Sequence, residues 1–128
     1  MKTEKEKMLA GELYCSYDPE LRAELLRARV LCEKLNRTSV ADEAERTRIL
    51  KELFGSAGER IDVLSDFHCD YGSNIHVGEN FFMNYGGVIL DVCKVTIGDN
   101  CMIAPQVGIY AAYHPMDPET RNSGREYG

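Results

Sequence analysis

Two residues in the second half of the sequence have side chains suited to chemistry at a reacting centre. His114 stands in a His-Pro pair, and an imidazole, whose ordinary pKa is about 6.5, can accept and return a proton at neutral pH. Asn84 follows Met83 at a position where the chain is expected to turn, and its amide could bind an oxygen. Taken alone, a loop His-Pro pair and a corner Asn are more often turn residues than catalytic ones.

A third candidate is Asp70, whose carboxylate could accept hydrogen bonds from neighbouring hydroxyl groups. An Asp beside a turn is also commonly just solvated. The run His68-Cys69-Asp70 looks like a metal-binding cluster. However, adjacent residues of a strand point to opposite faces, and no companion ligands occur at zinc spacing. We therefore expect no metal.

A repeat surrounds these candidates. The segment Tyr71-Gly72-Ser73-Asn74 returns as Val77-Gly78-Glu79-Asn80 and as Ile97-Gly98-Asp99-Asn100, with a period of six. The bulky residues that define the period, with one two-residue slip, are Tyr71, Val77, Met83, Ile89, Ile97, Ile103 and Ile109. A second row lies two residues earlier and consists of Cys69, Ile75, Phe81, Gly87, Val95, Cys101 and Val107.

A period of six fits neither an ordinary strand, which alternates every two residues, nor a helix with 3.6 residues per turn. It is typical of a parallel β-helix, in which each unit is a short strand followed by a turn and three units close a triangular coil. The inward rows then stack into a continuous apolar column. We therefore predict a mainly β fold for this part of the chain.

The residues before Gly55 predict helices. Apolar residues recur at helical spacing at Met8, Leu9, Leu13 and Tyr14. A second helix is expected to start with Asp18 as its N-cap and Pro19 in its first position, and a third after the capping pattern that ends at Asp42. Because nine of the eleven glycines follow Ser56, we predict an α-helical N-terminal cap in residues 1–55 and the β-helix in residues 56–128.

The charge balance excludes several classes of function. The 128 residues include 15 Lys+Arg against 21 Asp+Glu, a net charge of −6, which argues against binding to nucleic acid. No apolar run approaches the roughly 20 residues of a membrane helix, and the first residues lack the apolar core of a signal peptide. Five cysteines without a C-x-x-C pair favour reduced thiols. We expect a cytoplasmic protein without a membrane partner.

With their flanking segments, the repeats resemble the maltose and galactoside O-acetyltransferase family, and the maltose type is the closest. The resemblance covers essentially the whole chain. The segments that carry it are Glu6–Tyr14, Cys69–Ile75, Asn80–Asn84, Leu90–Cys93, Ile97–Pro105 and His114–Pro118. It implies left-handed coils, a homotrimer with sites between neighbouring subunits, and transfer of an acetyl group from acetyl-CoA to a hydroxyl of maltose, glucose or a related sugar.

The resemblance also implies roles for individual residues. The catalytic base of the family matches His114, and an active-site asparagine that could bind the acceptor or steady the oxyanion matches Asn84. Asp70 and Ser16 match positions that contact the sugar, and Ser16 follows the maltose type, since the galactoside type has an aspartate there. Phe82 could stack on a sugar face or simply pack.

Family members continue past the position of Gly128 with further coils, so roughly the last third of the family pattern is expected to be absent from this sequence. Much of the coenzyme A groove of the family comes from that part. After Lys94, Arg121 and Arg125 are the remaining cations, a small supply for a ligand with several phosphate charges. The alternative interpretation is therefore a truncated, catalytically incomplete remnant that at most trimerises or binds sugar.

Overall fold

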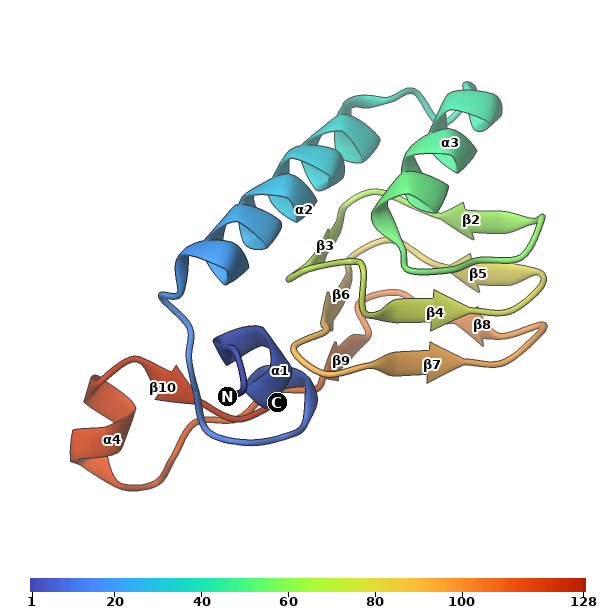
Figure 1. Ribbon diagram of the computed structural model, residues 1–128. Helices are drawn as coiled ribbons and strands as arrows, with labels where there is room; N and C mark the ends of the chain where they lie inside the picture. Colours follow the sequence, from blue (N-terminus) through green and yellow to red (C-terminus); the bar gives the residue numbers. More distant parts are fainter.

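The computed structural model describes residues 1–128 and contains four helices and ten strands (Figure 1). The helices are α1 (Glu4–Leu9), α2 (Pro19–Arg37), α3 (Glu43–Leu53) and α4 (Pro118–Asn122). Two short strands, β1 (Tyr14–Cys15) and β10 (Arg125–Glu126), pair with each other in antiparallel fashion. The remaining strands are β2 (Ile61–Val63), β3 (Phe67–Cys69), β4 (Ile75–Val77), β5 (Phe81–Met83), β6 (Gly87–Leu90), β7 (Val95–Ile97), β8 (Met102–Ile103) and β9 (Gly108–Tyr110).

These eight strands wind into a left-handed parallel β-helix with three faces. The faces are the parallel sheets β2-β5-β8, β3-β6-β9 and β4-β7. The register is constant, because each residue pairs with the residue twenty positions later, as Ile61 does with Phe81 and Ile75 does with Val95. One coil is therefore three six-residue units plus two extra residues. The mainly β, left-handed β-helical fold with a helical N-terminal part is confirmed.

The predicted rows are wrong at two residues. Cys69 is in register with Ile89, so it belongs to the first inward row, whereas Tyr71 lies in the corner between β3 and β4. The physical reason is the extra pair of residues in this corner: the step from Cys69 to Val77 spans eight residues, like the later step from Ile89 to Ile97. Tyr71 instead joins a second apolar cluster with Met8, Tyr14, Leu21 and Val92.

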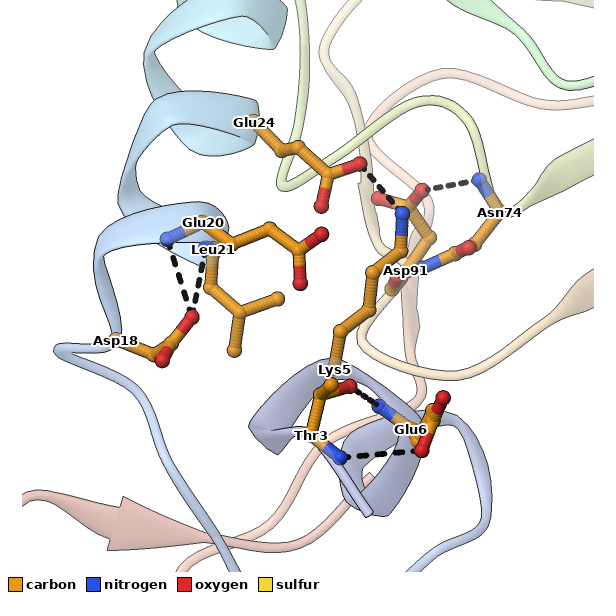
Figure 2. A network of polar contacts seen from close by, with 9 residues as sticks. All are labelled: Thr3, Lys5, Glu6, Asp18, Glu20, Leu21, Glu24, Asn74 and Asp91. Carbon is orange, nitrogen blue, oxygen red and sulfur yellow. Dashed lines mark hydrogen bonds and ion pairs between the residues drawn. The ribbon is translucent and has the colours of Figure 1, made fainter. Parts of the chain in front are cut away.

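The helix starts follow local capping chemistry. The Asp18 carboxylate accepts the backbone N–H groups of Glu20 and Leu21 at 3.1 and 3.4 Å (Figure 2), which satisfies the free donors at the start of α2. Asp42 caps α3 in the same way. The predicted starts of both helices are confirmed.

The first predicted helix is shorter than its apolar spacing suggests. A capping box between Thr3 and Glu6 starts α1, and the helix ends at Leu9 (Figure 2). Tyr14 lies in β1 instead, because the backbone of this segment pairs with β10 at the other end of the sequence. A long-range pairing thus overrides the local helical pattern.

The helices cover the β-helix and share its core. One cluster of 17 buried residues combines side chains of α2 and α3 with the inward rows of the strands. In Figure 1, α2 runs beside β3 and α3 lies next to β2. The buried Arg46 of α3 donates hydrogen bonds to the carbonyl oxygens of Leu35, Thr38 and Val63. It therefore ties the end of α2 to the first coil.

No helix in the chain is both long enough and apolar enough to cross a lipid bilayer.

Candidate active site

The segment that carries His114 is held in place by residues from both ends of the sequence. After β9, Tyr113 and Tyr127 exchange two backbone hydrogen bonds of 3.1 and 3.0 Å, and their rings stack with centroids 4.7 Å apart. The antiparallel pair of β1 and β10 continues from this bridge. His114 follows Tyr113 directly, so this ladder fixes its backbone, while its side chain is 52% exposed.

Glu126 of β10 links His114 to the buried Tyr14 of β1. The Tyr14 hydroxyl donates a hydrogen bond of 2.6 Å to Oε1 of Glu126. The other carboxylate oxygen, Oε2, lies 3.6 Å from Nδ1 of His114, which is an ion-pair distance rather than a hydrogen bond. Burial, followed by the hydrogen bond to Glu126, raises the pKa of Tyr14. Tyr14 therefore stays neutral and donates.

This arrangement suits proton transfer. The Glu126 carboxylate lies 3.6 Å from Nδ1 of His114, and Nε2 is then the nitrogen that is free to accept a proton. The exposed imidazole can be approached by a substrate, while Tyr14 and Glu126 are packed behind it. His114 therefore has the surroundings of a general base.

Asp70 lies in the same region. Its carboxylate is half-buried, and burial raises its pKa, with a further contribution from the negative charge of Glu126. The positive charge of Arg29 on α2 acts in the opposite direction. Asp70 and Glu126 are therefore close enough to repel each other, and the predicted sugar contact belongs to the same acidic region as His114.

Asp91 holds the corner that presents Asp70. Its carboxylate is fully buried and accepts the N–H groups of Asp70, Tyr71 and Asn74 at 3.1, 2.9 and 3.2 Å. The Asn74 amide returns a hydrogen bond of 2.8 Å to the Asp91 carbonyl oxygen. Burial raises the pKa of Asp91 to about 6. Figure 2 shows Asp91 bound to Asn74 in this corner. Asp91 thus fixes the backbone of Asp70.

Ser16 also lies next to β1, in contact with the turn before β10. Its hydroxyl donates a hydrogen bond of 2.6 Å to the carbonyl oxygen of Gly124, and its N–H binds the same oxygen at 3.3 Å. Gly124 has a positive φ of 83°, which glycine adopts without strain. Ser16 thus anchors the turn that leads to Glu126, and a contact between Ser16 and a sugar stays a prediction.

Asn84 and Phe82 lie elsewhere on the chain. Asn84 follows β5, where its Oδ1 accepts the Tyr85 N–H at 2.8 Å and its NH₂ group makes no hydrogen bond. Phe82 points outward from β5, in register with the exposed Met102, and lines a groove of about 410 Å³ beside α3. Neither residue makes a hydrogen bond with His114. Asn84 and Phe82 belong to the β5 face, whereas His114 and Asp70 share the region of Glu126.

The run His68-Cys69-Asp70 does not converge on one point. His68 is exposed and Cys69 is buried on β3, so the alternation expected for a strand places them on opposite faces.

Sequence reasoning missed Glu126 as a functional residue and treated Tyr14 as part of a helix. No spacing rule links the two, because their contact spans 112 positions. Glu126 can be recognised as a candidate only when β10 is seen to pair with β1. A useful signal would have been a carboxylate in the segment that follows His114.

Comparison with known proteins places the chain among the hexapeptide-repeat acetyltransferases. The family described as "Maltose acetyltransferase hexapeptide capping motif" matches residues 7–58. The solved structure of a maltose O-acetyltransferase from Clostridium difficile 630 has a TM-score of 0.97 and 53% sequence identity, and the match covers 99% of this chain and 68% of that one.

Two further relatives agree. A galactoside acetyltransferase solved in complex with coenzyme A has a TM-score of 0.94 and 34% identity, covering 100% of this chain and 64% of that one. Nodulation protein L of Rhizobium meliloti (strain 1021) is 48% identical over 128 residues, which is 99% of this chain and 69% of that protein. The chain belongs to the maltose and galactoside O-acetyltransferase family, and it spans about two thirds of the length of these relatives.

Proposed function

We propose that this chain is an acetyl-CoA-dependent O-acetyltransferase that acts on a hydroxyl group of maltose, glucose or a related sugar. The observation that carries the proposal is the placement of an exposed imidazole against a fixed carboxylate, with Asp70 in the same region. Family membership supports the type of reaction. The five free thiols support a reducing compartment, the cytoplasm.

His114 is the general base in this proposal. Acetyl-CoA supplies the acetyl group as a thioester with an electrophilic carbonyl carbon. As the sugar oxygen forms its bond to that carbon, Nε2 of His114 takes the hydroxyl proton, and the charge of Glu126 stabilises the imidazolium. When the carbon–sulfur bond breaks, His114 returns the proton to the departing thiolate.

The acceptor is oriented by groups that bind hydroxyls. Asp70 accepts hydrogen bonds from the sugar, and Asp91 keeps its backbone in position. Ser16 and Phe82 are the further candidates, the first through its hydroxyl oxygen and the second by stacking on an apolar sugar face.

The donor side depends on residues with different chemistry. The unbonded NH₂ group of Asn84 is suited to the developing oxyanion. Arg121 on α4 and Arg125 on β10 are exposed cations in the segment that follows His114, and guanidinium groups of this kind pair with phosphate.

A homotrimer would bring the two groups of residues together. Asn84 and Phe82 make no hydrogen bond with His114 within one chain, and in a trimer the β5 side of a neighbouring subunit would supply both residues to its site. Closed symmetry repeats such a contact identically three times. We therefore place the complete site between subunits.

The test is mass-spectrometric detection of acetylated sugar from the purified chain, acetyl-CoA and maltose or glucose. We expect product from the wild-type chain and a rate lower by roughly 10²- to 10⁴-fold in His114→Ala, since this is the range that general bases contribute. His76→Ala removes an imidazole of β4 that hydrogen-bonds the Ser56 hydroxyl and is the matched control, with a rate near that of the wild type.

The absence of product from a folded, trimeric sample would overturn the proposal. The chain would then be left with sugar binding or trimer formation as its role, and the binding of maltose by calorimetry would separate these two outcomes.

A further inference from the structure

Two of the five cysteines lie in contact in the core, away from His114. Cys32 on α2 and Cys69 at the end of β3 have their sulfur atoms 3.8 Å apart, and both residues are more than nine-tenths buried. The sulfur atoms of a disulfide are about 2.05 Å apart, so bond formation requires them to approach by roughly 1.8 Å.

The elements that carry the two cysteines are fixed against each other. One turn beyond Cys32, the Asn36 amide donates to the Phe67 carbonyl oxygen at 3.0 Å and its Oδ1 accepts the Phe67 N–H at 3.0 Å. Phe67 is two residues before Cys69, on the same strand. α2 and β3 lie side by side in Figure 1, and this two-fold hydrogen bond keeps the sulfur atoms in contact.

A surface groove borders both cysteines. It has a volume of about 520 Å³, and its lining residues include Cys32 and Cys69 together with Arg29, Arg37 and His68. The thiolate is the reactive form of cysteine. The hydrogen bond from the Cys69 thiol lowers the pKa of Cys32, so Cys32 is the better nucleophile of the two.

We propose that Cys32 and Cys69 are a redox modification site, at which a small-molecule disulfide oxidises them to an intramolecular disulfide. The Cys32 thiolate attacks one sulfur of the oxidant, forms a mixed disulfide and releases the first small thiolate. That thiolate takes the proton of Cys69, and the Cys69 sulfur attacks the Cys32 sulfur of the mixed disulfide and releases the second small thiolate, which takes up the proton that Cys32 had lost. Two protein thiols are oxidised, and one small disulfide is reduced to two thiols.

The position of this bond connects it to the rest of the molecule. It joins α2 to the residue that directly precedes Asp70, and it closes a loop between positions 37 residues apart. A cross-link of this kind restricts the unfolded chain, so the oxidised protein is expected to unfold at a higher temperature than the reduced one.

The test uses the full folded chain and glutathione disulfide as the oxidant. After oxidation, iodoacetamide blocks the remaining thiols, and peptide mapping without reduction locates each cysteine. We expect one linked peptide pair that contains Cys32 and Cys69, with Cys15, Cys93 and Cys101 alkylated. The reduced sample is expected to show all five cysteines alkylated after unfolding.

Three variants complete the test. Cys32→Ser and Cys69→Ser are expected to abolish the linked pair, while Cys101→Ser, which changes a half-buried cysteine of another face, is expected to keep it. A wild-type sample with folded circular dichroism that gains no link between Cys32 and Cys69 would overturn the proposal. Links spread over the other cysteines, as in a sample oxidised in urea, would overturn it as well.

Discussion

Glu126 is the residue on which two parts of the site depend. One of its oxygens accepts the Tyr14 hydroxyl at 2.6 Å, and the other lies 3.6 Å from the imidazole of His114. The first contact fixes the orientation of the carboxylate, and the second places its negative charge near the imidazole. Orientation and charge can therefore be removed separately by mutation.

Glu126→Gln keeps an oxygen for Tyr14 and removes the charge. We expect kcat for sugar acetylation to fall by roughly 10- to 100-fold, a part of the total contribution of a general base, because the imidazolium loses its counter-charge. Steady-state kinetics with maltose would measure the effect, and Glu119→Gln on the exposed helix α4 is the control. An unchanged kcat would remove Glu126 from the mechanism.

The buried Asp91 gives the chain a characteristic pH dependence. Burial raises its pKa from the ordinary 3.8 to about 6, so the native state binds this proton more tightly than the unfolded state. Its contribution to stability is then fully present below the unfolded pKa and is lost as the pH rises through about 6.

We expect the free energy of unfolding of the wild-type chain to fall by roughly 2 kcal/mol relative to Asp91→Asn as the pH rises from about 4 to about 7. Urea unfolding of both proteins across this range would measure the difference, which cancels the other titrating groups. Parallel curves for the two proteins would show that Asp91 has no raised pKa.

At the scale of elements, carboxylates of one coil repeatedly bind the backbone of the coil before it. Asp91 binds the corner at Asp70, Asp99 accepts the Glu79 N–H at 2.8 Å, and Glu79 accepts the Glu59 N–H with both oxygens at 3.1 Å. Corners cannot use sheet hydrogen bonds, so these side chains satisfy their free donors. Each corner uses the same kind of hydrogen bond from a backbone N–H to a carboxylate, but the carboxylates are buried to different extents.

This difference in burial predicts that removing the carboxylates lowers the free energy of unfolding by unequal amounts. Asp99→Ala, at an exposed corner, is expected to lower the free energy of unfolding by about 0.5–1.5 kcal/mol, since water replaces the lost acceptor. Asp91→Ala leaves the buried Tyr71 N–H and two half-buried N–H groups without their acceptor and is expected to cost about 2–4 kcal/mol. Chemical denaturation at neutral pH compares the two, and equal costs would contradict the role of burial.

The sequence predicts these elements wherever the interactions that form them are local. The capping residues Asp18 and Asp42 predict the starts of their helices. The inward rows from Ile75 to Ile109 match the coils of the structure. Cys69 and Tyr71 were misassigned because the extra residues of one corner shift the row without changing its composition. Tyr14 was misassigned because its strand partner is more than a hundred residues away.

The candidate site divides in the same way. His114 and Asp70 are predicted as site residues because their surrounding segments carry the resemblance to the family. Glu126 is not, since its importance lies only in its distance to His114 and Tyr14. Contacts between the ends of a sequence leave no periodic trace, so they require the structure.

At the scale of the whole molecule, a site that takes His114 and Asn84 from different subunits leads to a prediction about mixed trimers. If each site combines His114 of one subunit with Asn84 of its neighbour, two inactive variants can complement each other. A refolded equal mixture of His114→Ala and Asn84→Ala chains is expected to regain about one quarter of the wild-type activity, because random closed trimers restore that share of the interfaces.

The control for this experiment is each variant refolded alone, which is expected to stay inactive. Light scattering of the mixture would check that trimers have formed. Trimers without recovered activity would mean that both residues act within one subunit, and an Asn84→Ala chain that is active alone would mean that Asn84 only forms the corner after β5.

The pairing of β1 with β10 has a consequence for the order of folding. Neighbouring coils join residues only twenty positions apart, whereas β1 and β10 join residues separated by more than a hundred. Closing the longer loop costs more chain entropy, and long-range pairs form late. A newly folding chain therefore passes through a period in which its coils are stacked but Tyr14 has not yet met the Glu126 carboxylate, so the orientation of that carboxylate is completed last.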